Sequence, residues 1–341
     1  MSDHRYGLAW NENHVQFDHN PFLKWLDTIS SVHAERAFNQ YTGKVVLLLS
    51  GGLDSYTAAA AVLRILNDKN PHEIYALTVQ YGQRHIREVN SALAVSKLLK
   101  VPEDNHIIMT VDLGKWGGSA LTDEDIELAT DGIEEGIPAS YVPNRNSVLF
   151  SLAGSYAESV GANVIVAGQN AVDYSGYPDC RPEFLAHMEN AIDTSSKRVD
   201  EGGPHFALLT PVVNMTKPEI IELGISCCVD YSATWSCYQG EEEACGVCDS
   251  CRIRIEAFQK LGVADPVPYA IDVPWTVVPL QLKDAEPIPP LSGKIGLPPE
   301  DIDWDDEVEL EGEDDEDEAE DEEFWGADDD DEDEEEAPAL V

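Results

Sequence analysis

A short stretch around residue 50 constrains the fold of this chain more than any other feature. Residues 45–49 (VVLLL) are consecutive apolar residues, as in a buried parallel strand, and residues 56–66 form an Ala-rich run typical of a helix. The residues between them, 50–55, read SGGLDS. Two adjacent glycines let backbone N–H groups approach a ligand, and the start of a helix adds unbonded N–H groups and the positive end of its dipole. The stretch therefore predicts a phosphate-binding loop in an α/β protein.

The composition of this loop indicates which phosphate chemistry to expect. It lacks the lysine of the G-x-x-x-x-G-K-[ST] loop, which holds a nucleotide for transfer of its γ-phosphate. SGGxDS instead resembles the PP-loop of ATP pyrophosphatases, which holds the β,γ-diphosphate while AMP is transferred. The resemblance implies a Mg-ATP site, with Asp54 orienting Mg²⁺ or its water. The expected ATP contacts are Leu49, Ser50, Gly51, Gly52, Leu53, Asp54, Ser55, Tyr56, Thr57, Ala58 and Ala59. An ordinary glycine-rich turn, with Asp54 as a simple helix-start residue, is the alternative.

Strand and helix patterns alternate after the loop as well. Strands are predicted at 45–49, 74–79, 107–111 and 163–167, and helices at 54–67, 86–100, 145–161, 216–224 and 252–261. This order is typical of the α/β class with a doubly wound, mostly parallel sheet, which binds ligands beyond the carboxyl ends of its strands. The loops 50–55, 80–88 and 168–181 each follow such a strand.

Charge is distributed very unevenly along the 341 residues, whose formal net charge is −45. Residues 300–336 contain 27 acidic residues and no Lys or Arg, and 39 acidic residues remain elsewhere against 21 basic ones. Affinity for nucleic acids depends largely on clustered Lys and Arg, so no nucleic-acid partner is expected. No stretch approaches 18 apolar residues, and the N-terminus has no apolar signal core. A cytoplasmic protein without a membrane partner is predicted.

The same patterns divide the chain into five parts. We expect an N-terminal extension at 1–42, an ATP-binding α/β domain at 43–226, a zinc-binding segment with a closing helix at 227–266, a Pro-rich linker at 267–299 and an acidic tail at 300–341. The tail has too few apolar residues to bury a core, so it is expected to be disordered. Whether the protein forms a homodimer is left open.

Four of the seven cysteines fall within fifteen residues, as Cys237, Cys245, Cys248 and Cys251. A large chain without an export signal favours metal binding over disulfides. Four thiolates make a closed tetrahedral zinc site, whose role is structural, and one zinc per chain is predicted. An iron–sulfur cluster is the main alternative, although nothing else in the sequence suggests electron transfer.

Six motifs in order then carry a resemblance to a known family. They are SGGLDS (50–55), YGQRH (81–85), YVPNRN (141–146), DYSGYPDCRPEF (173–184), TKPEI (216–220) and TWSCY…CGVCDSCRIRIEAF (234–258). Together they closely resemble the QueC family, the 7-cyano-7-deazaguanine synthases, over about residues 43–266. The resemblance implies a C–N ligase that converts 7-carboxy-7-deazaguanine and ammonia to the nitrile with ATP, on the route to queuosine and related 7-deazapurines. Adenylated acid and amide intermediates, release of AMP and two ATP per product are expected.

The motifs also supply candidate site residues. Basic residues suited to phosphate, or to charge developing on the α-phosphorus, are Arg84, His85, Arg145 and Lys217, and the expected catalytic set is Asp54, Arg145 and Lys217. The expected substrate contacts are Arg84, Asp173, Tyr174, Tyr177, Asp179 and Arg181. Asp173 and Asp179 suit a guanine-like N1–H and 2-amino edge, while Tyr174 or Tyr177 suits stacking on the heterocycle.

Two other functions remain open at this point. One is another adenylating PP-loop enzyme, either a tRNA thiolase or an amide-forming relative acting on a deazaguanine. The acidic composition argues against a nucleic-acid surface and therefore against the thiolase. The other is a zinc-ribbon interaction protein without catalysis, which the intact SGGLDS loop disfavours.

Overall fold

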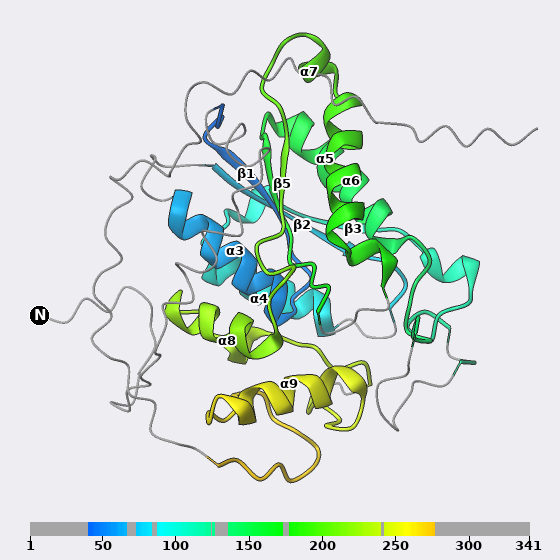
Figure 1. The fold of residues 1–341 in the computed structure, drawn as a ribbon, viewed down its shortest axis with the longest axis vertical. Helices are drawn as coiled ribbons and strands as arrows, with labels where there is room; N and C mark the ends of the chain where they lie inside the picture. The colour runs from blue at the N-terminus through cyan, green and yellow to red at the C-terminus, as the bar shows by residue number, and fades with distance from the viewer. Residues whose placement is uncertain are drawn as a thin grey trace, which may run out of the picture. The chain divides into compact units, whose positions relative to one another are not determined.

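A five-stranded parallel sheet forms the centre of the computed structural model (Figure 1). The structure describes residues 40–66, 73–83, 87–123, 125–126, 136–172, 177–239 and 242–276. The strands are β1 (Lys44–Leu48), β2 (Glu73–Gln80), β3 (His106–Thr110), β4 (Val164–Val166) and β5 (Ala207–Leu209). Their order is β3-β2-β1-β4-β5, and every neighbouring pair is parallel. The predicted α/β class with a doubly wound parallel sheet is confirmed.

Alternate residues of β1 face the two sides of the sheet and select the helices that cover it. Val45 and Leu47 belong to one core cluster, and Val46 and Leu48 belong to the other. The first cluster includes residues of α3 (Leu53–Leu66), α4 (Arg87–Leu98), α8 (Lys217–Ser226) and α9 (Asp249–Lys260). The second includes residues of α5 (Arg145–Val160) and α6 (Pro182–Thr194). Because β1 is buried on both faces, its sequence is a continuous apolar run rather than an alternating one.

The carboxyl ends of β1 and β4 lie where the strand order reverses. From β1 the chain proceeds to β2 and β3 on one side, and it then returns to β4 and β5 on the other. Connections leave β1 and β4 in opposite directions along the sheet, which opens a crevice between them. The loop 50–55 and the residues after β4 therefore meet at the same edge of the sheet.

Several elements differ in extent from the sequence-based prediction. Helix α8 does not end at Gly224 but continues to Ser226. Gly224 lacks the positive φ of a helix-ending glycine and instead packs closely against Tyr231. Strand β5 and helix α6 were not predicted. Strand β5 gives little signal because it has only three residues and lies in a run rich in Pro and Thr. The two short connecting elements η4 (Pro178–Cys180) and α7 (Lys197–Asp200) flank α6.

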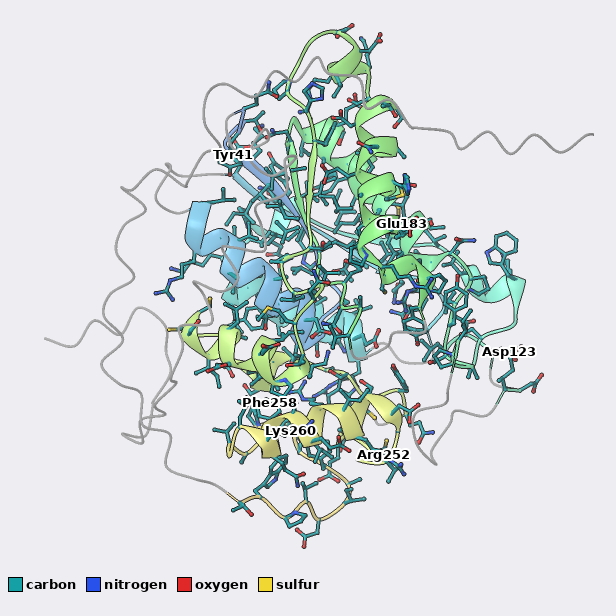
Figure 2. All side chains as sticks on the ribbon, in the orientation of Figure 1. Tyr41, Asp123, Glu183, Arg252, Phe258 and Lys260 are labelled. Atoms are coloured by element: carbon teal, nitrogen blue, oxygen red, sulfur yellow. The ribbon has the colours of Figure 1, made fainter. Side chains whose placement is uncertain are left out.

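Helix α9 closes the described chain against α8. Phe258 of α9 is 2 % exposed and belongs to the same core cluster as Ile220 and Ile221 of α8, and Figure 2 shows it in the layer between the two helices. The chain continues to pack beyond residue 266: Val267 is buried, and Tyr269 forms an isolated bridge with Ala244.

Other predictions concern residues outside the described ranges. These are most of the N-terminal extension, the part of the linker after residue 276 and the whole acidic tail. None of the helices in the described ranges is long and apolar enough to cross a membrane.

Candidate active site

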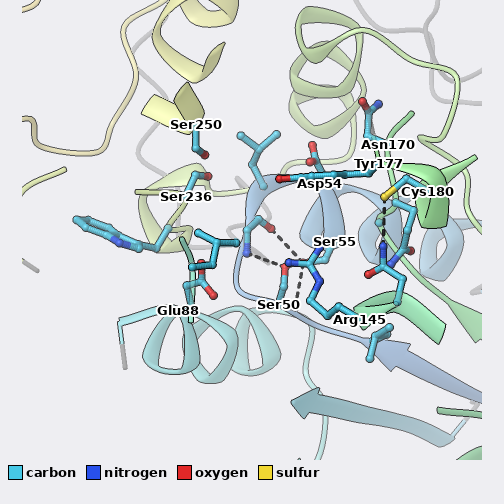
Figure 3. Close-up of a pocket in the computed structure, with 18 of the residues that line it drawn as sticks. Ser50, Asp54, Ser55, Glu88, Arg145, Asn170, Tyr177, Cys180, Ser236 and Ser250 are labelled. Atoms are coloured by element: carbon cyan, nitrogen blue, oxygen red, sulfur yellow. Dashed lines mark hydrogen bonds between the residues drawn. The ribbon is translucent and has the colours of Figure 1, made fainter. Parts of the chain in front are cut away.

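A cavity of about 250 Å³ opens at the edge of the sheet where the order of strands reverses (Figure 3). Its wall combines the phosphate loop, the starts of α5 and α8, and the cysteine-rich segment. Of the residues predicted for the site, those that line the cavity are Ser50, Gly52, Leu53, Asp54, Ser55, Arg145, Tyr177 and Lys217. Leu49, Gly51 and the helical residues Tyr56, Thr57, Ala58 and Ala59 lie outside this lining. Three cationic and two acidic side chains line the described wall, so the cavity is less acidic than the chain as a whole.

Close backbone packing fixes the phosphate loop in place. Gly51 has a φ of +83°, and a Cβ there would lie 2.3 Å from the carbonyl oxygen of Glu88. A Cβ at Gly168, just after β4, would lie 2.4 Å from the backbone nitrogen of Ser55. Only glycine fits both positions, so the phosphate loop and the start of α3 sit directly against the first turns of α4 and against the residues that follow the carboxyl end of β4.

Hydrogen bonds within the loop give it a defined shape. The Ser50 and Ser55 hydroxyl oxygens lie 3.1 Å apart, and the backbone N–H of Gly52 donates to Ser50 Oγ over 3.3 Å. Ser55 Oγ also donates to the carbonyl oxygen of Gly52 over 3.1 Å. The loop is thus organised by its own side chains and meets the first turn of α3, where helical N–H groups lack intrahelical acceptors.

An ion pair joins the loop to α8 across 163 residues of sequence. Lys217 Nζ donates to both carboxylate oxygens of Asp54, at 2.8 and 2.7 Å. Lys217 is the first residue of α8, whose start is fixed by a capping box between Thr216 and Glu219. The lysine is 8 % exposed. The structure therefore brings two of the three predicted catalytic residues into direct contact.

Arg145, the third predicted catalytic residue, begins α5 on the other side of the cavity. Its guanidinium carbon lies 5.2 Å from the centre of the Tyr81 ring, in a cation–π contact. Its Nε is buried and has no hydrogen-bond partner in the described part of the chain. A buried donor without a partner costs free energy unless a ligand satisfies it, so Arg145 is well suited to hold a phosphate or carboxylate oxygen.

Glu88 lines the same cavity and was not predicted. It lies in the first turn of α4, and Figure 3 shows it beside the phosphate loop. Burial raises the pKa of Glu88 to about 7, although the positive charge of Arg145 acts in the opposite direction. Its position three residues after the YGQRH motif is the only signal in the sequence that points to it.

The predicted substrate loop is described only from residue 177 onward. Tyr177 lines the cavity, and its hydroxyl lies 2.7 Å from Ser140 Oγ. Asp179 is buried outside the lining, where its Oδ2 accepts the backbone N–H of Asn146 over 3.0 Å. Arg181 is exposed at the start of α6. Arg84, His85, Asp173 and Tyr174 lie outside the described residues, and the substrate contacts remain predictions.

Further wall residues come from the cysteine-rich segment. Trp235, Ser236, Tyr238 and Ser250 line the cavity. The indole Nε1 of Trp235 is buried without a hydrogen-bond partner among the described residues, and Arg87 lies 4.7 Å from its ring centre. A lone tryptophan in a motif gives no indication of this contact, because only the fold carries it to the phosphate loop.

The four clustered cysteines converge as predicted. Their sulfur atoms all lie within 4.8 Å of one another, and Cys245 and Cys251 are 3.9 Å apart. The backbone N–H of Cys245 donates to Cys237 Sγ over 3.2 Å, which favours a negatively charged sulfur there. Hydrogen bonds that Cys237 accepts from neighbouring thiols lower its pKa, whereas the hydrogen bonds of Cys251 with Cys237 and Cys248 raise the pKa of Cys251. This set of donors fits one metal ion.

Comparison with known proteins places this geometry in context. A family model described as "Queuosine biosynthesis protein QueC" matches residues 44–262, which include both the phosphate loop and the four cysteines. The chain belongs to the QueC family. The predicted family, and with it an enzyme of queuosine biosynthesis that forms C–N bonds, is confirmed.

Individual members of the QueC family are similar over nearly their whole length. The 7-cyano-7-deazaguanine synthase of Cyanothece sp. is 47% identical over 235 residues, which cover 66% of this chain and 99% of that protein. The synthase of Ralstonia nicotianae is 49% identical over 228 residues, covering 66% and 98%. That of Thermoplasma volcanium is 47% identical over 231 residues, covering 67% and 91%. The family model leaves the residues before 44 and after 262 unmatched.

Proposed function

We propose that this QueC-family enzyme converts 7-carboxy-7-deazaguanine and ammonia to 7-cyano-7-deazaguanine at the cavity beside β1, at the expense of two ATP. The observation that carries the proposal is the convergence of the phosphate loop, the Asp54–Lys217 pair and Arg145 on one cavity. The names of the relatives supply the product.

The first activation makes the carboxylate reactive. A carboxylate oxygen of the substrate attacks the α-phosphorus of ATP. The bond between that phosphorus and the oxygen shared with the β-phosphorus breaks, so pyrophosphate departs and an acyl adenylate is formed. In our proposal residues 50–55 hold the pyrophosphate, and Lys217 and Arg145 stabilise the negative charge on the phosphorus oxygens. Ammonia then attacks the acyl carbon, and AMP leaves to give the amide.

The second activation acts on the amide. Its oxygen attacks the α-phosphorus of a second ATP, pyrophosphate leaves, and loss of a nitrogen-bound proton gives an adenylated imidate. Loss of the last nitrogen-bound proton with departure of AMP then forms the nitrile. Both rounds need the same groups around the α-phosphorus, so a single phosphate loop is sufficient for both.

Magnesium is expected to enter with ATP and to neutralise charge on its phosphates. Asp54 is the carboxylate residue of the phosphate loop itself, between Ser50 and Ser55, and both of its carboxylate oxygens contact Lys217. We infer that Asp54 orients the cation or its water, and that Lys217 then turns toward the phosphate oxygens.

The cysteine site is proposed to bind one structural zinc ion per chain. Four sulfurs at about 2.3 Å from one ion in a tetrahedron are separated by roughly 3.8 Å, close to the 3.9 Å between Cys245 and Cys251. In a [4Fe–4S] cluster each cysteine binds a different iron, so the sulfurs lie farther apart. The close grouping therefore supports zinc.

A homodimer is supported by the exposed edge of the sheet. Ile107, Ile108 and Met109 of the edge strand β3 are 38 to 41 % exposed. An edge strand with consecutive exposed apolar residues is a pairing site unless it is covered. We infer that a second copy of the chain covers this edge. We also infer that the protein is cytoplasmic, because the four clustered thiols stay reduced in that compartment.

Product analysis tests the proposed function directly. The purified protein is incubated with 7-carboxy-7-deazaguanine, ammonium and Mg-ATP, and the products are identified by mass spectrometry. The expected result is the nitrile with two AMP and two pyrophosphate per product. Accumulation of the amide alone identifies an amide-forming relative, and absence of any deazaguanine product rejects the proposal.

A further inference from the structure

The reaction proposed above requires a base, and this inference rests on that function. Nitrogen enters as ammonium or ammonia and ends in a nitrile without any N–H bond. After ammonia attacks the acyl adenylate, the cationic adduct must lose a proton before AMP departs. Formation of the imidate and then of the nitrile each removes one further proton from the same nitrogen. Each of these three protons needs an acceptor inside the cavity.

Few groups of the described wall are able to accept a proton near neutral pH. The two carboxylates that line the cavity are Asp54 and Glu88. Asp54 contacts Lys217 through both oxygens, and in the proposed reaction it orients Mg²⁺ or its water, so it is engaged with a cation in either state. Burial raises the pKa of Tyr81 to about 12 and that of Cys180 to about 11, so both stay protonated. Glu88 is the remaining candidate.

The position of Glu88 suits this task. Its backbone packs against the phosphate loop, since its carbonyl oxygen is the nearest atom to a Cβ built on Gly51, at 2.3 Å. Its side chain faces the cavity (Figure 3). Three charged or titratable groups on other elements lie close enough to interact electrostatically with it, namely Tyr81, Arg145 and Cys237. Arg145 acts on the pKa of Glu88 without a salt bridge between the two in the described part of the chain, and both line the cavity.

We propose that Glu88 is the catalytic base of the enzyme, binding ammonium through its carboxylate and accepting the protons that nitrogen loses on the way to the nitrile. Deprotonated Glu88 takes a proton from ammonium and leaves ammonia beside the acyl adenylate. It then accepts N–H protons from the adduct, the activated amide and the imidate, and returns each to water between steps. The two adenylation steps themselves transfer no proton to Glu88.

The experiment separates adenylation from proton transfer. Glu88→Gln preserves the shape of the side chain and removes the base. With 7-carboxy-7-deazaguanine and ATP but no ammonium, we expect the burst of pyrophosphate to stay within about twofold of wild type. Nitrile formation is expected to fall by about 10²- to 10⁴-fold, and the KM for ammonium to rise. With the amide as substrate, pyrophosphate should still be released while the nitrile forms slowly.

Two further variants act as controls. Glu189→Gln changes a buried carboxylate on α6, whose pKa burial also raises to about 7 but which does not line the cavity. It should leave the ammonium KM and the nitrile rate unchanged. Glu88→Asp keeps the charge one methylene farther back and should retain part of the activity, with zinc content and melting temperature equal to wild type.

The outcomes distinguish this inference from the function on which it rests. A Glu88→Gln enzyme with wild-type nitrile rate and ammonium KM overturns the role of Glu88. Loss of the pyrophosphate burst in the same variant also overturns it, because Glu88 would then act on ATP. A wild-type enzyme that releases pyrophosphate but never forms nitrile rejects the proposed function instead, and with it the need for the base.

Discussion

The phosphate loop and the cysteine-rich segment line the same cavity but are stabilised in different ways. The loop extends from β1 and α3, whose core residues include Val45, Leu47 and Ala58, all fully buried. The segment contributes no strand to the sheet in the described ranges. It depends instead on four cysteines and on a buried pair in which Arg254 contacts Asp265 at 2.6 and 2.9 Å. One wall thus rests on many small apolar contributions and the other on a few strong polar ones.

This difference predicts how each wall fails. Removing one methylene from a packed core costs about 1 kcal/mol, and the remaining contacts persist. Removing one ligand or one partner of a buried ion pair leaves an unsatisfied charge, which costs several times more. The cysteine-rich segment should therefore respond to single substitutions much more strongly than the loop, whose substitutions should affect chemistry and not folding.

The largest effect is expected from Cys248→Ser. Structural zinc binding contributes about 10–16 kcal/mol of apparent free energy in small zinc-dependent domains, and a shell of three thiolates is incomplete. We expect insoluble or strongly destabilised protein with less than one zinc per chain, measured by elemental analysis and thermal unfolding. Cys228→Ser, at an exposed cysteine outside the cluster, is the matched control. Iron absorption in the active enzyme, or wild-type stability of Cys248→Ser, contradicts the zinc assignment.

Next in size is the effect of Asp54→Ala on chemistry. The variant loses the partner of Lys217 and the group expected to orient Mg²⁺, so release of AMP and pyrophosphate should fall at least about 10³-fold. Zinc content and melting temperature should be preserved. Lys197→Ala, which removes only an exposed lysine paired with Glu201, should keep full activity. Normal turnover of Asp54→Ala, or loss of its zinc, would contradict the expectation that the phosphate loop serves chemistry and the cysteine-rich segment serves folding.

Asp265→Asn tests the ion pair of the cysteine-rich segment. Arg254 would remain buried without its carboxylate, so the free energy of unfolding should fall by about 3–5 kcal/mol. Chemical denaturation measures this, with Asp200→Asn at an exposed position as the control. A loss below about 1 kcal/mol means that zinc alone holds the segment.

A smaller effect is expected from Glu189→Gln on the sheet side of the comparison. Burial raises the pKa of Glu189 from 4.5 to about 7, so the folded protein binds a proton that the unfolded chain has released. This contribution to stability is present below pH 4.5 and lost as the pH rises through about 7. The free energy of unfolding of wild type relative to Glu189→Gln should therefore fall by up to about 3 kcal/mol across that window.

Denaturation series at several pH values check this prediction. Glu183→Gln changes an exposed carboxylate on the same helix α6 and should follow the wild-type curve. Parallel curves for wild type and Glu189→Gln would show that Glu189 has an ordinary pKa.

The smallest effect is expected from truncation after Pro299. Residues 300–341 contain many acidic residues and no Lys or Arg, and they lie outside the part of the chain that matches the family model. We expect unchanged kcat and only a modest change in solubility or in the response to salt, measured side by side with the full chain. Loss of activity on truncation would show that the acidic tail also contributes to the active site.

Local sequence was sufficient for the elements whose signals are short-range. The apolar run of β1 and the SGGLDS turn predicted a strand, a loop and a helix, and the structure has them at β1, residues 50–55 and α3. The Cys-x7-Cys-x2-Cys-x2-Cys spacing likewise predicted a converging set of sulfurs, because the last three ligands lie within one turn and the start of a helix. In both cases the relevant contacts join residues close in the chain.

Contacts between distant segments were decided only by the tertiary structure. The sequence placed Lys217 and Arg145 on separate helices, and the order of strands brought their starting residues to the same cavity. Glu88 resembles any acidic residue in the first turn of a helix until the close packing at Gly51 sets it beside the phosphate loop. Sequence motifs therefore determined the family and the chemical groups. The sheet's reversal at β1 decided which of those groups meet, since it alone sets the distances between side chains far apart in the chain.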